Sequence, residues 1–453
     1  MNIKRRLLTL TATTAVVATG TIATAAATAT NQSLIISAEF IAQLAEEMRT
    51  NNPALLATTV RTNAAAAAVK AVRTWDDPML TVGGMGADEM MRRDEGDILY
   101  GVEQKLPLFG KPAAARRVAR AELDVETLGA DYEFQSRRAE LAKAVFRAAL
   151  AEQIVAIGDQ DLKWLNSMAD TMEARYRVGD ATIMELLQVQ NEQSRRLTRL
   201  QTDRAEIDHQ HLGLNRMLNR DLQSAWPSLT LPSVAAPVPY NQSLVRLAIK
   251  NEPKLLMMRQ QTKQALAAAD ATRRERWPEV SLGVGNRNYS GNGDWVQTEV
   301  MLNFSLPLFN AKKYRADIHR DEARAKATEL DTADYELSLR EEIHLLTVRI
   351  DAARREALAY RDEIIPRSES ALESARANWE SGRVAGGFRD VLDARRMLLE
   401  ARLMYARAVA EQYQMLSELV LCCGLGDLEA LQMLGIEFES DAPATIETNA
   451  TKP

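Results

Sequence analysis

Histidine is the residue type with which this sequence would most readily bind a transition metal, and it occurs only four times. His209 and His211 stand two positions apart in a helical stretch, so their side chains leave the helix in different directions. His319 and His344 do not complete a site with them. Solvated or packed histidines are the simpler interpretation, and the sequence predicts no metal site.

The two cysteines, Cys422 and Cys423, are adjacent, which excludes a disulfide framework. A strained bridge between neighbours is uncommon. A soft-metal site is one interpretation of the pair. The other is that both pack as small apolar side chains near a helix end, before Gly424.

Met85, Met90 and Met91 are further soft donors, and they suit either contact with a cation such as Cu(I) or ordinary apolar packing. The sequence has no glycine-rich phosphate loop, no nucleophile beside a base and no zinc signature. We therefore expect no enzyme and no cofactor.

The tetrapeptide Leu-Pro-Leu-Phe occurs twice, at 106–109 and 306–309, and marks an internal duplication. Other pairs follow in the same order, such as "NPALL" at Asn52 and "EPKLL" at Glu252. Chance does not explain several ordered matches. The predicted organisation is a first repeat over 30–220, a proline-rich linker over 221–241, a second repeat over 242–424 and a tail over 425–453.

The amino end has the pattern of a secretory signal. Lys4, Arg5 and Arg6 precede an uncharged segment that ends in Ala27-Thr28-Ala29, so we expect cleavage after residue 29. A short amphipathic or disordered tail is the alternative. Loss of three basic residues makes the formal charge of −6 more negative, and the charge therefore gives no support for nucleic-acid binding.

Apolar and polar residues alternate in two segments of each repeat, which predicts strands with one apolar and one polar face. The pattern predicts hairpins over about 79–106 and about 279–306. In the second hairpin, Val300, Leu302 and Phe304 share one face, and Glu299 and Asn303 share the other.

Long helices follow each Leu-Pro-Leu-Phe, over about 112–219 and 311–422. Apolar residues repeat in heptads from Leu339 to Ile364, a stripe that requires a partner helix. A helix from Pro112 to a turn near Gly179 would be on the order of 100 Å long, and a matching turn is expected near Gly382. Pro366 should kink the second long helix.

Four strands with one apolar face suggest a pore built from several chains. An open four-stranded sheet in lipid would leave backbone groups at its edges without partners, so strands of other chains must close it. Two copies would give eight strands and three would give twelve. Pro107 and Pro307 would end strand pairing, and Phe109 and Phe309 would lie at the membrane edge. Ordinary strand ends in a soluble α+β protein are the alternative.

The signal, the duplication, the hairpins that end in Leu-Pro-Leu-Phe and the paired turns resemble the TolC-type outer membrane factors of tripartite efflux systems. The motif "LPLFGK" is most similar to the heavy-metal branch of this family, the CzcC- and CusC-like proteins. The resemblance implies a mainly α-helical fold, in which long antiparallel coiled-coil helices form a periplasmic tunnel. It also implies that four strands of each chain enter a shared transmembrane β-barrel.

The same resemblance implies a homotrimer in the outer membrane of a Gram-negative bacterium, with a large periplasmic portion and with membrane lipid around the strands. The expected partners are a periplasmic adaptor protein and an inner-membrane pump of the RND type, and no nucleic acid. Some family members carry a lipid on a cysteine after the signal; no cysteine precedes Cys422, so we expect no lipidation at the amino end.

Site residues are implied by the two turns and by the motif "DVLD". Asp390 and Asp393 match the family's aspartate gate, and residues three apart share a helix face. Threefold symmetry would turn them into two carboxylate rings; a solvated acidic face is the alternative. Candidate adaptor contacts lie at the turns: Arg177, Val178, Gly179, Asp180, Thr182, Gly382, Arg383 and Val384.

Three functions agree with these patterns. The first is a passive duct for heavy-metal cations, the second is a duct of the same family for drugs or polypeptides, and the third is a structural coiled-coil protein of the envelope. The third would need the heptads but not two amphipathic hairpins.

Overall fold

A computed structural model describes residues 34–85, 97–289, 293–381 and 387–426. Several predicted features lie outside the described residues: the signal, Met90 and Met91, the turn residues Gly382, Arg383 and Val384, and the tail beyond residue 426. The side chain of Met85 is also not described.

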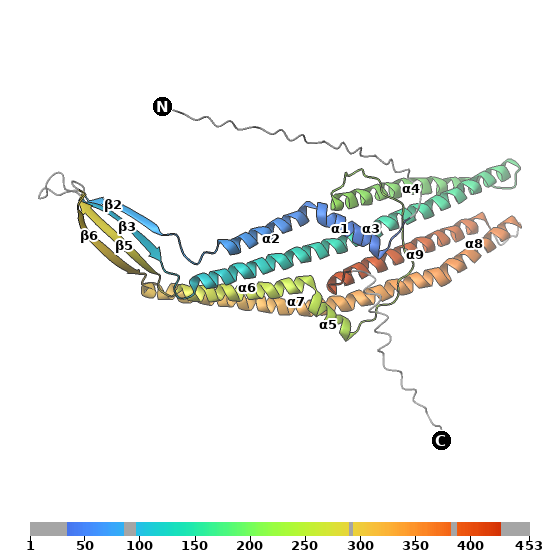
Figure 1. Ribbon diagram of the computed structural model, residues 1–453. Helices are drawn as coiled ribbons and strands as arrows, with labels where there is room; N and C mark the ends of the chain where they lie inside the picture. The colour runs from blue at the N-terminus through green and yellow to red at the C-terminus, as the bar shows by residue number, and fades with distance from the viewer. Residues whose placement is uncertain (1–33, 86–96, 290–292, 382–386, 427–453) are drawn as a thin grey trace, which may run out of the picture.

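The sheet has four antiparallel strands in the order β2-β3-β5-β6. Their bounds are β2 (Met79–Met85), β3 (Asp97–Lys105), β5 (Val280–Tyr289) and β6 (Trp295–Phe304). Each repeat contributes one hairpin, and β3 pairs with β5 to join the two. The sheet stands at one end of an elongated molecule (Figure 1). The outer edges of β2 and β6 have no neighbouring strand within the described chain.

The register places most of the apolar side chains of the four strands on one face, whereas Leu99 and Met301 lie on the other. Leu80 lies opposite Val102, Val102 opposite Val284, and Val284 opposite Val300. These four side chains are between 49% and 71% exposed. An apolar face this open to solvent in a single chain indicates a membrane or partner surface.

Hydrogen bonds and ion pairs cover the opposite face. Glu103 of β3 accepts hydrogen bonds from Ser281 and, at 3.1 Å, from Asn303. Asp97 pairs with Arg287 across the β3–β5 ladder. The two faces therefore differ as the alternation predicts.

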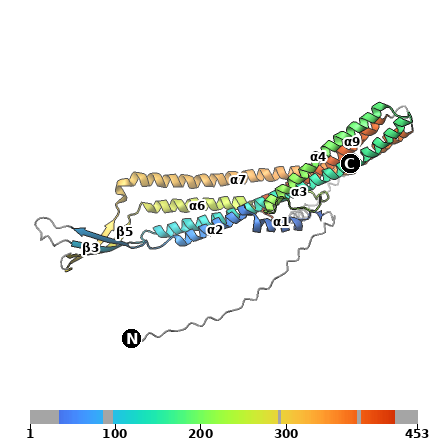
Figure 2. The same cartoon turned by 90° about the horizontal axis from the view of Figure 1, so that it is seen from above.

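Two long helical hairpins run away from the sheet (Figure 1). The first consists of α3 (Lys111–Arg177) and α4 (Ile183–Leu218). The second consists of α7 (Ala311–Ala359), a π-helical turn (Tyr360–Ile364), α8 (Ile365–Glu380) and α9 (Phe388–Cys422). Figure 2 shows that the end of the bundle with α4 and α9 is inclined to the part beside the sheet.

Shorter helices line the long ones: α1 (Ala38–Asn51), α2 (Pro53–Ala71), α5 (Gln242–Asn251) and α6 (Pro253–Glu275). The duplicated "NPALL" and "EPKLL" segments begin α2 and α6 in the same way. Each places proline in the first turn, and the side chains of Asn52 and Glu252 accept backbone hydrogen bonds there. The short strands β1 (Leu34–Ile35) and β4 (Leu229–Thr230) pair in parallel.

The main core lies where α1, α3, α5, α7 and α9 meet, and it includes Phe146, Leu339, Ile343, Ile350 and Leu416. The heptad stripe is buried from Leu339 to Ala357, whereas Ile364 is 38% exposed. The π-helical turn at residues 360–364 comes just before Pro366, whose missing N–H interrupts the regular hydrogen bonding. The helices that the structure describes include none with the length and hydropathy of a membrane-spanning segment.

Candidate functional site

The ends of the two helical hairpins farthest from the sheet share a small apolar core, which we call the tip cluster. Its members come from all four helices: Leu165, Met168, Met172, Leu186, Val189, Trp379, Phe388, Val391 and Leu392. The rings of Trp379 and Phe388 are 5.4 Å apart. The cluster therefore holds the ends of α3, α4, α8 and α9 together.

The turn between α3 and α4 exposes the residues that the sequence places there. Gly179 has φ 78, and an added Cβ would meet nothing within 4 Å. Val178 is 79% exposed. Asp180 accepts a hydrogen bond from Arg175 at 2.9 Å, and Arg177 pairs with Glu173.

Thr182 and Glu185 form a capping box at the start of α4. The Thr182 amide donates to Glu185 at 2.8 Å, and the Glu185 amide donates to the Thr182 hydroxyl at 3.3 Å. Thr182 thus has a structural role that does not depend on a partner protein.

Trp379 takes part in the tip cluster and is only 8% exposed. The guanidinium of Arg175 lies 4.4 Å from the centre of its ring. Arg175 also pairs with Asp180 at 2.8 Å, so this arginine links the α3–α4 turn to the end of α8.

Asp390 and Asp393 lie in the first two turns of α9, and both are accessible. Asp390 accepts a hydrogen bond from the Gly387 amide at 3.2 Å, which satisfies a backbone donor at the helix start. Asp393 pairs with Arg396 at 2.9 Å and lies 3.7 Å from Arg389. The solvated acidic face and the carboxylate-ring hypothesis both agree with this exposure.

A buried carboxylate, Asp161 of α3, holds two arginines from two other helices. Its side chain is 5% exposed and lies 3.0 Å from Arg196 of α4 and 2.8 Å from Arg395 of α9. The Arg395 guanidinium also lies over the ring of Trp164 at 5.0 Å. Asp161 therefore connects the two hairpins, one helical turn before Leu165 of the tip cluster.

Asp161, Arg196 and Arg395, which we call the triad, line a groove of about 190 Å³. The groove is lined by residues of α3, α4 and α9. Glu192 accepts from Arg195 at 3.2 Å and also pairs with Arg396. The Glu192 hydrogen bond raises the pKa of Arg396. The lining of the groove also includes Leu165, Arg199, Leu392 and Leu399.

The sequence analysis did not single out Asp161. A signal was present, because Ile157, Asp161, Leu165, Met168 and Met172 stand at spacings of four, four, three and four, so a charge occupies a position on the apolar stripe of α3. Arg395 stands in the same way between Leu392 and Leu398. Charges at such positions are expected to be paired.

Cys422 and Cys423 are both free and buried near the end of α9. Burial raises the pKa of both thiols, that of Cys423 to about 12, so both are neutral at pH 7. Within the described chain, no cluster of three or more histidine, cysteine, aspartate or glutamate side chains is arranged to hold a metal ion.

Two carboxyl groups near these thiols titrate abnormally. Burial raises the pKa of Glu252, which accepts a hydrogen bond from the Tyr335 hydroxyl at 3.2 Å. Burial and the charge of Glu418 raise the pKa of Glu342 on α7. These groups join α6, α7 and α9 beside the main core.

The junction between sheet and helices contains the four residues that the sequence places there. Pro307 begins a 3₁₀ turn, and Phe309 within it is 89% exposed. Phe109 has φ 56 and stacks on Trp277 with ring centres 5.4 Å apart. Pro107 follows the last residue of β3 by two positions.

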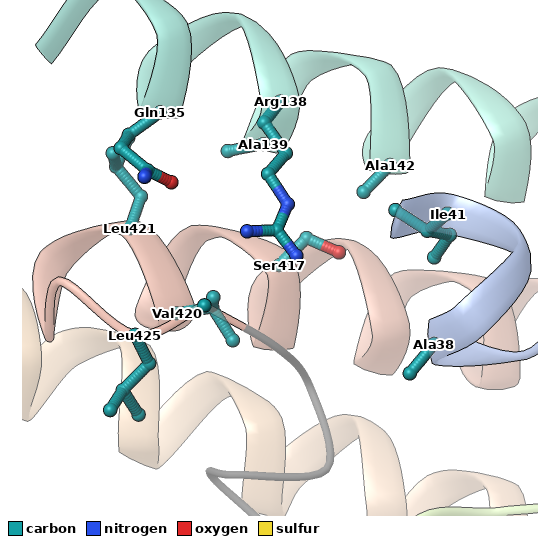
Figure 3. A pocket seen from close by; sticks show the side chains of 11 residues that line it. Ala38, Ile41, Gln135, Arg138, Ala139, Ala142, Ser417, Val420, Leu421 and Leu425 are labelled. Carbon is teal, nitrogen blue, oxygen red and sulfur yellow. The ribbon is translucent and has the colours of Figure 1, made fainter. Parts of the chain in front are cut away.

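A pocket between α1, α3 and α9 has a volume of only about 30 Å³, enough for about one water molecule. Figure 3 shows Arg138 reaching from α3 toward Ser417 on α9, with Ile41 and Ala142 beside it. A site for a drug-sized ligand needs several hundred Å³, so this pocket is too small to be one.

Comparisons with known proteins agree with this architecture. The family model described as "Outer membrane efflux protein" matches residues 44–220 and 244–425. The cobalt-zinc-cadmium resistance protein CzcC of Cupriavidus metallidurans is 23% identical over 185 residues. That match covers 41% of this chain and 42% of CzcC.

Solved structures share the fold at low identity. The outer-membrane channel OprN matches with a TM-score of 0.75 at 18% identity, over 87% of this chain and 91% of that one. CusC matches with a TM-score of 0.74 at 18% identity, over 86% and 93%. VceC of Vibrio cholerae matches with a TM-score of 0.73 at 17% identity, over 86% and 97%.

The predicted resemblance, the mainly helical fold with four antiparallel strands and the absence of enzymatic activity are confirmed by these matches. The chain therefore belongs to the outer membrane efflux protein family of TolC-type transport channels.

Proposed function

We propose that the chain forms a homotrimeric duct whose twelve strands share one transmembrane barrel. The observation that carries the proposal is the sheet: one face is apolar and exposed, and the edges of β2 and β6 lack a neighbouring strand in the described chain. In lipid, each unpaired backbone group at an edge is costly, so β6 of one copy must pair with β2 of the next.

The long helices then continue the duct into the periplasm. Their polar faces would surround water, while the heptad stripes hold each protomer together. The turn at Gly179, at the end opposite the sheet, and the turn that the sequence predicts near Gly382 would meet a periplasmic adaptor. Through the adaptor the duct would accept cargo from an inner-membrane pump of the RND type.

Asp390 and Asp393 would form the gate. Three copies around a narrow axis place six carboxylates close together, where they attract cations and repel one another as the duct closes. Arg389 and Arg396 pair with Asp393 and would moderate that repulsion.

The gate assignment is tested by conductance of the purified protein in planar bilayers. Asp390→Asn with Asp393→Asn removes both charges and leaves an oxygen that can still accept from Gly387. We expect higher conductance and weaker block by multivalent cations. The matched control is Glu400→Gln with Glu411→Gln, which removes two exposed carboxylates farther along α9. Equal currents and equal block in both variants would count against the gate.

Heavy-metal cations are the proposed cargo. The support is the partial likeness to CzcC, a cobalt-zinc-cadmium resistance protein, and the "LPLFGK" wording at the junction. Compared with the wild-type strain, a deletion strain should show a larger gain in sensitivity to cobalt, zinc, cadmium, copper or silver than to detergents and dyes. The reverse pattern would favour drug export, and failure to secrete a polypeptide would favour polypeptide export.

A further inference from the structure

Four exposed basic residues lie where the second repeat passes from sheet to helix, and we call them the junction patch: Arg276, Lys312, Lys313 and Arg315. Arg276 is the C-cap residue directly after α6, and the other three lie in the first turns of α7. The two helix ends are neighbours, because the Ser305 amide donates to the Glu279 carbonyl at 2.9 Å and Thr272 donates to Asp321 at 2.7 Å.

The junction patch has no carboxylate partner in the part of the chain that the structure describes. Arg276 lies 5.5 Å from the Trp277 ring centre, Lys313 lies 5.9 Å from that of Tyr314, and Arg315 donates to the Ala311 carbonyl at 3.3 Å. Other arginines one or two turns away are paired, Arg273 with Glu322 and Arg274 with Asp270. The lack of carboxylate partners is therefore confined to these four residues, since the nearby Lys105 and Lys111 both pair with Glu279.

Helix electrostatics do not explain these cations. The first turn of a helix favours acidic residues, and α7 has none there. Residues 305–316 contain three basic residues and no acidic one, and the duplicated segment 105–117 contains four basic residues and no acidic one. Both repeats thus concentrate basic residues at this place, but in the first repeat Lys105, Lys111 and Arg117 are paired with carboxylates.

Apolar side chains adjoin the junction patch. Phe304 and Leu306, at the end of the apolar sheet face, are 56% and 63% exposed, and Phe309 is 89% exposed. Trp277 is 45% exposed. An exposed apolar band bordered by aromatic rings and then by lysine and arginine is complementary to the edge of a lipid leaflet, where acyl chains give way to phosphates.

We infer that the junction patch binds the headgroup phosphates of anionic phospholipids in the leaflet that faces the periplasm. The inference rests on the proposed orientation of the sheet in the membrane. Each cation near an anionic lipid surface contributes about 1 kcal/mol, a factor of about five in affinity. The interaction should weaken as salt screens it.

The test uses the full chain in detergent micelles. Dibrominated phosphatidylglycerol, or dibrominated phosphatidylcholine, is titrated in, and its binding is measured as quenching of tryptophan fluorescence by the bromine atoms. Trp277 is exposed and lies beside Arg276, so its fluorescence should report lipid bound at the junction patch. We expect the wild type to prefer the anionic lipid at least tenfold at low salt. The variant Lys312→Gln/Lys313→Gln/Arg315→Gln keeps Arg276, and in it we expect a preference of no more than about fivefold.

The matched control is Arg340→Gln/Arg349→Gln/Arg355→Gln, which removes three exposed charges from the same helix. Its first substitution lies 25 residues beyond Arg315, about 38 Å along α7. The control should keep the wild-type preference. An unchanged preference in the junction variant, or an equal loss in the control, would overturn the inference.

Inorganic phosphate distinguishes a lipid surface from a site for the free anion. It should compete no better than chloride at equal ionic strength, and stronger competition would refute binding of a lipid leaflet. Conductance in planar bilayers is measured separately. A protein that prefers the anionic lipid but conducts no ions would contradict the proposed duct and leave the lipid contact standing.

Discussion

Replacing Asp161 by alanine should loosen the contact between the two helical hairpins near their tips. The change leaves the guanidinium groups of Arg196 and Arg395, only 15% and 14% exposed, without their shared counter-ion. Removing one partner of a buried ion pair costs about 3–5 kcal/mol, mainly because the remaining charge is desolvated and unpaired. Here two such charges remain on two different helices.

Hydrogen exchange of backbone amides measures this loss where it occurs. A cost of about 3–5 kcal/mol corresponds to exchange faster by between about 10² and several times 10³, because each 1.4 kcal/mol is a factor of about ten. The faster exchange should be confined to α3, α4 and α9 around the triad. Amides in the sheet should keep their wild-type rates.

Asp159→Asn is the matched control. Asp159 lies two residues earlier on α3 and bonds Arg204 at 2.9 Å, but its side chain is 37% exposed. A solvated pair of this kind contributes at most about 1 kcal/mol. A second variant, Asp161→Met/Arg196→Met/Arg395→Met, should recover most of the stability, since apolar groups of similar volume can replace a buried ion network. If Asp161→Ala changed exchange by less than twofold, the triad would not hold the hairpins together.

Two further predictions concern single residues. Gly179→Ala should destabilise the protein by about 1–2 kcal/mol, because a Cβ disfavours the positive φ of the α3–α4 turn. Gly213→Ala lies inside α4, also with free space around it, and should stabilise the protein by about 1 kcal/mol. Thermal unfolding of the two variants checks that the two changes have opposite signs. Glu342→Gln should flatten the dependence of Tm on pH above the ordinary pKa of a glutamate side chain. Burial and Glu418 raise the folded-state pKa of Glu342, so the stability linked to its proton is full below the unfolded pKa and is lost as pH rises through the folded one. Cys422, Lys143 and Lys254 also face Glu342, and an unaltered pH profile would show that they balance the burial.

The sequence predicted the strands well because side chains alternate along any strand, whatever pairs with it. Val300, Leu302 and Phe304 lie on one face and Asn303 on the other, as the alternation indicated. It predicted neither the β3–β5 pairing, which joins the two repeats, nor the π-helical turn before Pro366. Both depend on how segments far apart in the chain are placed.

The sequence by itself determined the duplication, the apolar and polar faces, the heptad stripes and the positions of the turns, since each follows from a local period. Only the tertiary structure decided that Asp161 meets Arg196 and Arg395, 35 and 234 positions away, and that Arg175 covers Trp379. A period reports whether a side chain is buried. Which side chain it meets depends on the register of one helix against another, and many residues together set that register.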